Sequence, residues 1–357
     1  MVRSLVLAAL VVGIAAAAPS TATDRPTPGV APSRVGIADG GDVQTLAPRD
    51  RGRYLDGIRG AGARWIRVGL YWAVVQRGGR TSYDWKAFDA VVKAARRRGL
   101  NVLGTLLYTP AWARPAGTRA NSPPTDPTDF GTFAGRAASH FRARGVQAYE
   151  IWNEPNIAAF WAPGPDPARY TELLAQAYRA IKRADPSATV VSGGLSPYAG
   201  YGVADAQHMN PLTFLEQMYA NGARKSMDAV GWHPYSFPSG LRYHPWSSWS
   251  QMAQTRPSAR SIMRANGDAA KKISATEWGA PTGASPVSMT EEAQAQLVTD
   301  ALTRLKAWRW TGPSFLYTFR DKGTNAADRD DNFGLVRHDW SAKPAYEAFR
   351  RVAAARP

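Results

Sequence analysis

The chain has 357 residues, no cysteine and a formal net charge of +16. The lack of cysteine excludes disulfides and thiolate metal sites. The positive charge allows an acidic partner, such as a uronic-acid polysaccharide or an anionic cell surface, although arginine spread over solvated faces explains it more simply. No basic run is interleaved with aromatic residues as in a nucleic-acid-binding module, so we expect no nucleic-acid partner.

Residues 1–22 have the pattern of a secretory signal peptide. Arg3 precedes an apolar run from Leu5 to Ala18, and small residues suited to cleavage follow as far as Ala22. The run is shorter than the roughly 20 residues that span a bilayer, and no stop-transfer pattern follows, which disfavours a membrane anchor. We therefore expect a secreted protein without a membrane span in the mature chain. Residues 23–33, rich in proline and threonine, are expected to be a flexible lead.

From residue 34 onward, short β-branched or apolar runs alternate with longer segments of helical periodicity. A helix over residues 84–98 would place Phe88, Val91 and Val92 on one face. A second helix, over about 290–307, would begin with acids in its first turn, where the helix dipole favours them. The eight predicted strands cover residues 34–38, 63–71, 101–108, 148–153, 189–194, 228–233, 272–278 and 314–319.

Strands that alternate with helices pair in parallel through right-handed crossovers. Eight such units close more readily into a (β/α)8 TIM barrel than into an open sheet. No GxGxxG follows the first predicted strand, which disfavours a dinucleotide-binding fold. The sequence therefore predicts an α/β protein with a single barrel domain over residues 34–357, whose active site lies at the carboxyl ends of the strands.

Two glutamates lie at such strand ends. Glu154 follows the fourth strand in YEIWNEPN (149–156), and Glu277 lies at the end of the seventh in ISATEWG (273–279). A buried carboxylate is costly unless something offsets it, so acids at strand ends usually serve a function. The barrel would bring both to its mouth. Two carboxyl groups facing each other across a cleft suit glycoside hydrolysis, in which one protonates the leaving oxygen and the other attacks the anomeric carbon.

The stretches WNEPN, HPY, TEWG and the closing FGLV and KPAYEAF resemble the clan A glycoside hydrolases, above all families 39 and 5. The family 39 group includes secreted endoglycosidases that cut exopolysaccharide. The resemblance covers nearly the whole mature chain. It implies a retaining reaction without cofactor or metal, in which Glu154 is the general acid/base and Glu277 is the nucleophile.

The same resemblance implies roles for four further residues. Asn153 would hydrogen-bond the 2-hydroxyl of the sugar that is cleaved. Arg67, placed at the end of the second strand, would keep Glu277 ionised, and Tyr235 would donate to the same carboxylate. His233 matches the histidine of the family's His-x-Tyr motif. For Arg67 and His233, a purely structural hydrogen bond is the alternative.

Two positions depart from the family 5 pattern. Tyr108 stands where family 5 members carry a histidine near the end of the third strand, and Tyr317 stands where they usually carry a tryptophan. These departures leave the sugar open, while Tyr317 keeps an aromatic face for a pyranose ring. Trp112 and Trp278, near predicted strand ends, are further candidates for sugar contact. So is the stretch YHPWSSWSQM (243–252) after the sixth strand.

The acidic loop at 328–339 partly matches a calcium-binding loop. Asp328, Asp330, Asn332 and Asp339 occupy offsets 1, 3, 5 and 12 of a calcium loop. Phe333 stands at the sixth position, where such a loop needs glycine, so a solvated loop is the better interpretation.

The sequence thus predicts a secreted, monomeric, retaining β-glycosidase that is endo-acting on a polysaccharide. An exo-acting β-glycosidase such as a β-xylosidase and a transglycosylase of wall polymers remain as alternatives. A non-catalytic carbohydrate-binding barrel is a third, and the presence of both glutamates with Asn153 argues against it.

Overall fold

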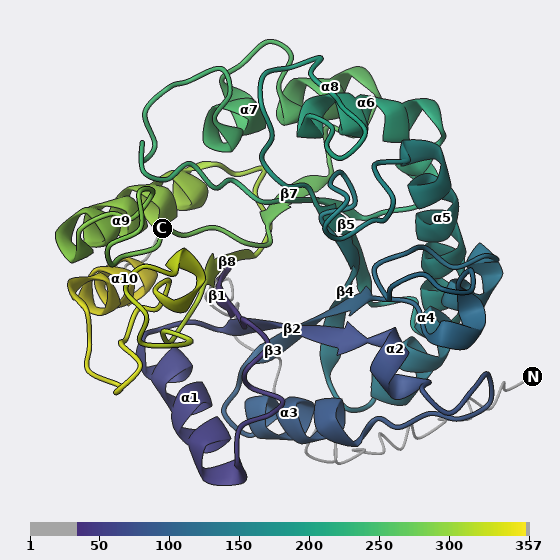
Figure 1. The fold of residues 1–357 in the computed structure, drawn as a ribbon, viewed down its shortest axis with the longest axis horizontal. Helices are drawn as coiled ribbons and strands as arrows, with labels where there is room; N and C mark the ends of the chain where they lie inside the picture. The colour runs from purple at the N-terminus through teal and green to yellow at the C-terminus, as the bar shows by residue number, and fades with distance from the viewer. Residues whose placement is uncertain (1–33, 355–357) are drawn as a thin grey trace, which may run out of the picture. The chain divides into compact units, whose positions relative to one another are not determined.

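The computed structural model describes residues 34–354, which form one eight-stranded parallel sheet with helices between the strands (Figure 1). The signal peptide and flexible lead expected at residues 1–33 lie outside the described part. The order of the strands in the sheet is β7-β6-β5-β4-β3-β2-β1-β8. Their bounds are β1 (Val35–Ala38), β2 (Trp65–Tyr71), β3 (Asn101–Leu107), β4 (Val146–Asn153), β5 (Thr189–Gly194), β6 (Ala229–Trp232), β7 (Lys272–Ala275) and β8 (Ser314–Tyr317).

The sheet closes between β7 and β8 through isolated parallel bridges rather than a continuous ladder. One bridge joins Ile273 to Thr311, and the other joins Trp278 to Leu316. At the second bridge, the Trp278 N–H donates to Phe315 O at 3.1 Å, and the Tyr317 N–H donates to Trp278 O at 2.8 Å. These bonds complete the (β/α)8 barrel, so the predicted fold is confirmed.

The helices surround the strands (Figure 1). In α3 (Lys86–Arg96), Phe88, Val91 and Val92 are buried, as their helical spacing predicted. The N-cap of α9 (Glu291–Ala307) is Thr290, whose side chain accepts from the Ala293 N–H at 3.1 Å. No helix within residues 34–354 is long and apolar enough to cross a membrane. The other helices are α1 (Pro48–Gly60), α2 (Trp72–Val75), α4 (Pro127–Phe141), α5 (Pro167–Ala184), α6 (Pro211–Ala220), α7 (Ser248–Ala253), α8 (Ala259–Ala265) and α10 (Pro344–Ala354).

Strand alternation divides the buried residues into two clusters. The outward-facing residues of the strands join the large core beneath the helices, whereas a small cluster lies within the barrel. Because side chains alternate between faces, Ala148 in the inner cluster places Glu150, two residues on, on the interior face as well. Trp65 and Arg67 are related in the same way on β2. The small inner cluster contains Ala38, Leu103, Ala148, Val191, Ala229 and Phe315.

Two strand boundaries change the predicted position of site residues. Strand β2 runs from Trp65 to Tyr71, so Arg67 is its third residue. The prediction that Arg67 ends this strand is therefore wrong. Its side chain therefore lies deeper in the barrel than a strand-end residue would. Strand β7 ends at Ala275, so Glu277 lies between the strand and the bridge at Trp278. Glu154 is the first residue after β4, as expected.

Candidate active site

Glu154 and Glu277 line one cavity at the carboxyl ends of the strands, with a volume of about 260 Å³. The Glu154 N–H donates to Gly194 O at 3.0 Å, which ties the turn after β4 to the end of β5. Arg67, Asn153, Tyr108 and Tyr317 line the same cavity. A larger cavity, of about 1020 Å³, lies between residues 238–244 and α9, and no predicted site residue except the loop stretch at 243–252 reaches it.

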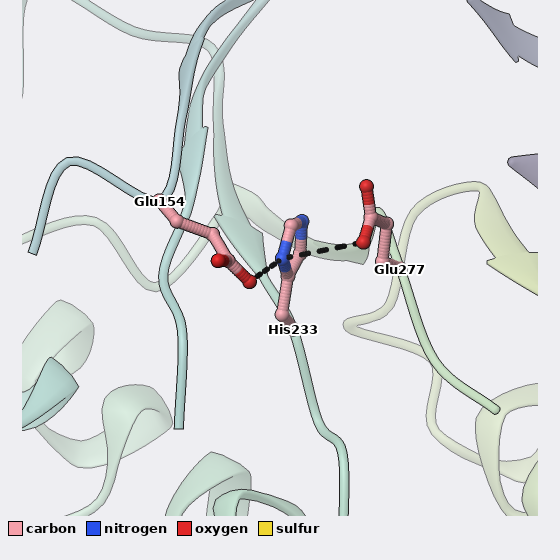
Figure 2. A group of neighbouring side chains, drawn as sticks. All are labelled: Glu154, His233 and Glu277. Atoms are coloured by element: carbon pink, nitrogen blue, oxygen red, sulfur yellow. Dashed lines mark hydrogen bonds and ion pairs between the residues drawn. The ribbon is translucent and has the colours of Figure 1, made fainter. Parts of the chain in front are cut away.

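His233 lies between the two glutamates (Figure 2). Its Nδ1 is 2.8 Å from Glu154 Oε1 and 3.8 Å from Glu277 Oε2. One carboxylate oxygen of each glutamate and one ring nitrogen of His233 all lie within 4.8 Å of one another. Two carboxyl groups this close agree with a retaining site, because an inverting site separates them by about 6.5–9.5 Å to admit a water.

Both carboxylate oxygens of Glu277 accept hydrogen bonds. Arg67 Nη1 donates to Oε1 at 2.5 Å, and the Tyr235 hydroxyl donates to Oε2 at 3.0 Å. Burial raises the pKa of Glu277, but the nearby positive charges of His233 and Arg67 and the Tyr235 hydrogen bond outweigh it, so the pKa lies below its ordinary value. This carboxylate is therefore held ionised, as a nucleophile must be.

His233 is fully buried, and its ring contacts the Glu154 carboxyl through Nδ1. Burial lowers the pKa of His233, but the carboxylates of Glu277 and Glu154 raise it by more, so the pKa lies above its ordinary value. The contact between His233 Nδ1 and Glu154 Oε1 holds the Glu154 carboxyl in position at the cavity that it lines.

Arg67 connects the site residues from within the barrel. Its guanidinium donates to Asn153 Oδ1 at 2.8 Å and to Glu150 Oε2 at 2.6 Å, in addition to Glu277. Because Asn153 Oδ1 accepts from Arg67, the side-chain NH2 group of Asn153 remains as a donor toward the cavity that this residue lines. A donor there suits recognition of a sugar hydroxyl.

Three backbone conformations at this site are rare for residues other than glycine. Tyr108, Trp152 and Glu154 have φ values of 66°, 72° and 44°. Each such residue costs on the order of 1–3 kcal/mol and persists only where the surrounding structure holds it. The strained positions include Tyr108 and Glu154, which both line the cavity.

The aromatic candidates divide into two groups. Tyr108 and Tyr317 line the cavity, and the ring of Tyr108 stacks on Tyr71 at 5.9 Å. Trp112 and Trp278 do not line it. Trp112 is half-buried, and its indole N–H donates to Gln76 O at 2.9 Å. Trp278 is fully buried in the core and leaves no exposed ring face, so sugar contact by these two tryptophans stays a prediction without structural support.

Three charged residues of this site were not predicted from the sequence. Glu150 is fully buried beneath the cavity, and Asp39 and Lys322 line it. Asp39 directly follows β1, so the strand-end argument that singled out Glu154 would have found it. The signal for Glu150 was an acid between apolar residues inside a strand. For Lys322 there was no comparable signal.

Burial raises the pKa of Asp39 to about 7, although the N–H groups of Val43 and Gly41 donate to its carboxylate at 3.2 and 3.0 Å.

Within residues 34–354, Glu154, His233 and Glu277 are the one group of three histidine or acidic side chains whose donor atoms could share a metal ion. The aspartates at 328–339 form no such group.

A family model for cellulase, described as glycosyl hydrolase family 5, matches residues 40–314, a range that contains both glutamates. No curated protein matches the chain. Among solved structures, a family 39 glycoside hydrolase from Bacteroides cellulosilyticus WH2 is similar at 25% identity and a TM-score of 0.69 over 90% of this chain and 64% of that one.

Two further solved structures share the fold. A glucosidase from Croceicoccus marinus matches at 18% identity and a TM-score of 0.63, over 84% of this chain and 62% of that one. A monomeric beta-xylosidase from Caulobacter crescentus CB15 matches at 22% identity and a TM-score of 0.68, over 91% and 68%. The chain thus spans slightly less than two thirds of the family 39 enzyme and of the glucosidase.

Proposed function

We propose, because the chain belongs to glycosyl hydrolase family 5, that it is a retaining β-glycosidase in which Glu154 is the general acid/base and Glu277 is the nucleophile. The observation that carries this assignment is the short separation of the two carboxyl groups, with oxygens within 4.8 Å of each other. The contrasting surroundings of the two groups support their different roles, since Arg67 and Tyr235 hold the Glu277 carboxylate, whereas His233 is the one side chain within residues 34–354 that bonds the Glu154 carboxylate.

The reaction proceeds in two displacements. A Glu277 oxygen forms a bond to the anomeric carbon as the glycosidic bond breaks, and Glu154 gives its proton to the leaving oxygen. Glu154 then takes a proton from water, which attacks the same carbon and releases Glu277. Two inversions restore the β configuration. The Asn153 amide group would bind the 2-hydroxyl, a contact that strengthens in the transition state.

Endo action on a polysaccharide is the proposed mode. Three aromatic side chains, Tyr201, Tyr243 and Trp246, are 49%, 57% and 45% exposed. They belong to the loops after β5 and β6, which lie at the same end of the barrel as the glutamates. Aromatic faces there suit additional sugar rings along a chain. The N-terminal sequence supports secretion, and we expect the enzyme to act extracellularly as a monomer.

The test is a panel of β-linked polysaccharides, with NMR of the product at early times. Release of oligosaccharides whose new reducing ends are first β supports the retaining endo mechanism. Release of single sugars favours the exo alternative, longer products formed with added acceptor favour transglycosylation, and an α product overturns retention. Glu277→Gln should abolish cleavage, whereas Glu292→Gln, an exposed acid in the first turn of α9, should not. Absence of cleavage across the panel would favour a non-catalytic barrel.

A further inference from the structure

Lys322 lines the same cavity as the two catalytic glutamates. It lies in the loop after β8, and its Nζ is 5.1 Å from the centroid of the Tyr317 ring. Its backbone N–H donates to Asp331 O at 3.0 Å. Lys322 is half-buried at the site where a sugar would bind.

The structure holds this lysine in place from two sides. Asp321, its neighbour, is buried and accepts from Lys343 Nζ at 2.8 Å and from the Gly334 N–H at 2.6 Å, which anchors the loop. On the other side, the Lys322 side chain passes directly over Gly40, after β1. A Cβ at position 40 would overlap Lys322 Cε, so the glycine provides the room that this side chain needs.

Within residues 34–354, no carboxylate lies within ion-pair distance of Lys322. Arg67, the other cation that lines the cavity, is paired with Glu150 and Glu277. Lys322 forms no ion pair with a carboxylate of residues 34–354 and has only the ring of Tyr317 as a charge-stabilising partner. An ammonium that lines a cavity without a carboxylate partner is available to pair with a substrate anion.

The remaining acids of the cavity leave this ammonium available. Glu277 is bonded to Arg67 and Tyr235, and Glu154 to His233. The carboxyl of Asp39 accepts from backbone N–H groups, and with its pKa raised by burial to about 7 it is largely uncharged in mildly acidic solution. An incoming anion would therefore meet the positive charge of Lys322 with little repulsion from Asp39.

We propose that Lys322 binds the carboxylate of a uronic acid residue, so that the preferred substrate is a β-linked polysaccharide containing uronic acid. The inference rests on the proposed glycosidase function and adds the class of substrate. An ammonium and a carboxylate form a charge-assisted hydrogen bond, which is strong in a partly desolvated cavity. The net charge of +16 also favours encounter with a polyanion.

Matched polymers test the proposal on the full chain. β-1,4-Glucuronan and β-1,4-glucan differ only at C6, and so do β-1,4-mannuronan and β-1,4-mannan. We expect a higher kcat/KM on at least one uronic acid polymer than on its neutral counterpart. Lys322→Met should lower that kcat/KM by roughly 10–100-fold, as expected for the loss of a charged hydrogen bond, and should lower kcat/KM on the neutral counterpart by clearly less, so that the ratio between the two polymers falls. Lys322→Arg, which keeps the charge, should retain most of the preference.

Two controls separate a local effect from a general one. Lys93→Met removes an equal charge from the exposed face of α3, so it should leave the preference unchanged. Calorimetric binding of a glucuronan or mannuronan oligosaccharide to Glu277→Gln should weaken on adding Lys322→Met, and the salt dependence of binding should decrease.

The outcomes are distinct. Cleavage of neutral polymers alone, or an equal effect of Lys322→Met on both members of a pair, overturns the substrate class and leaves the glycosidase function standing. Preference for cellulose sulfate over every uronic acid polymer overturns the carboxylate assignment. Failure to cleave any polymer of either kind counts against the glycosidase function itself.

Discussion

Arg67 Nε and Glu150 Oε2 lie 2.6 Å apart inside the barrel, and both side chains are buried. This ion pair joins β2 to β4 directly beneath the site. Glu150 also accepts from Thr105 Oγ1 at 2.9 Å and from the Gly194 N–H at 3.1 Å, so its oxygens are well satisfied. The guanidinium of Arg67 is thereby fixed where its other nitrogens can reach Asn153 and Glu277.

Glu150→Gln should strongly destabilise the fold. Removing one partner of a buried ion pair costs about 3–5 kcal/mol in free energy of unfolding when the other charge is left uncompensated. Because Arg67 keeps its ion pair with Glu277, we expect a cost toward the lower end of that range. The control is Glu172→Gln, which breaks an exposed pair with Arg169 and should cost about 1 kcal/mol or less. Urea unfolding followed by circular dichroism measures both. Equal losses for the two variants would show that the buried pair has no special structural weight.

Tyr235→Phe should move the acidic limb of the kcat/KM profile to higher pH. The Tyr235 hydroxyl donates to Glu277 at 3.0 Å and favours its ionised form, so the pKa of Glu277 should rise when this hydrogen bond is lost. Tyr219→Phe, which removes a hydrogen bond to Asp268 far from the cavity, is the control and should leave the limb in place. An unmoved limb in Tyr235→Phe would assign this tyrosine to packing alone.

Glu154→Gln and Glu277→Gln should fail at different steps. An activated aryl glycoside departs without acid assistance, so Glu154→Gln should release a burst of phenol and then stall, because no base activates water. Azide should restore its turnover and yield a β-glycosyl azide. On a natural substrate, its defect should be on the order of 10²–10⁴-fold.

Glu277→Gln should show no burst on any substrate, because no nucleophile remains to form the glycosyl-enzyme. Stopped-flow measurement of phenol release distinguishes the two variants. A burst from the 277 variant and none from the 154 variant would reverse the assignment of roles.

Asp39→Asn should change the dependence of stability on pH. In the folded chain, the pKa of Asp39 is about 7 against an ordinary 3.8. The unfolded chain thus loses this proton near pH 4, while the folded chain keeps it until about pH 7, so stability falls as pH rises between these values and the loss is complete above pH 7. The difference corresponds to as much as about 4 kcal/mol.

The asparagine cannot ionise, so the variant should gain stability relative to the parent between pH 5 and pH 8. Urea unfolding at the two pH values measures this gain. Asp300→Asn, which removes an exposed carboxyl on α9, is the control. A gain of equal size in both variants would attribute the effect to net charge and not to the buried position of Asp39.

The alternation of eight strands and helices, and the positions of Glu154 and Glu277 at strand ends, can be predicted from the amino-acid sequence alone. Both follow from local information, since hydrophobic periodicity reports which face of an element is buried and a strand end reports which edge of a barrel a residue reaches. The hydrogen bond from Tyr235 to Glu277 was also anticipated, through the family resemblance of the residues around it.

The contacts between segments far apart in the chain depend on the closed barrel and could not be predicted from local sequence. Arg67 and Glu150 are 83 positions apart and meet because β2 and β4 both point alternate side chains into the barrel. Asp39 and Lys322 share a cavity because β1 and β8 pair, with Ala38 opposite Tyr317. Packing also determines whether Trp112 and Trp278 face the core or the cavity. The sequence shows that a tryptophan is present, but its burial depends on which other parts of the chain pack against it.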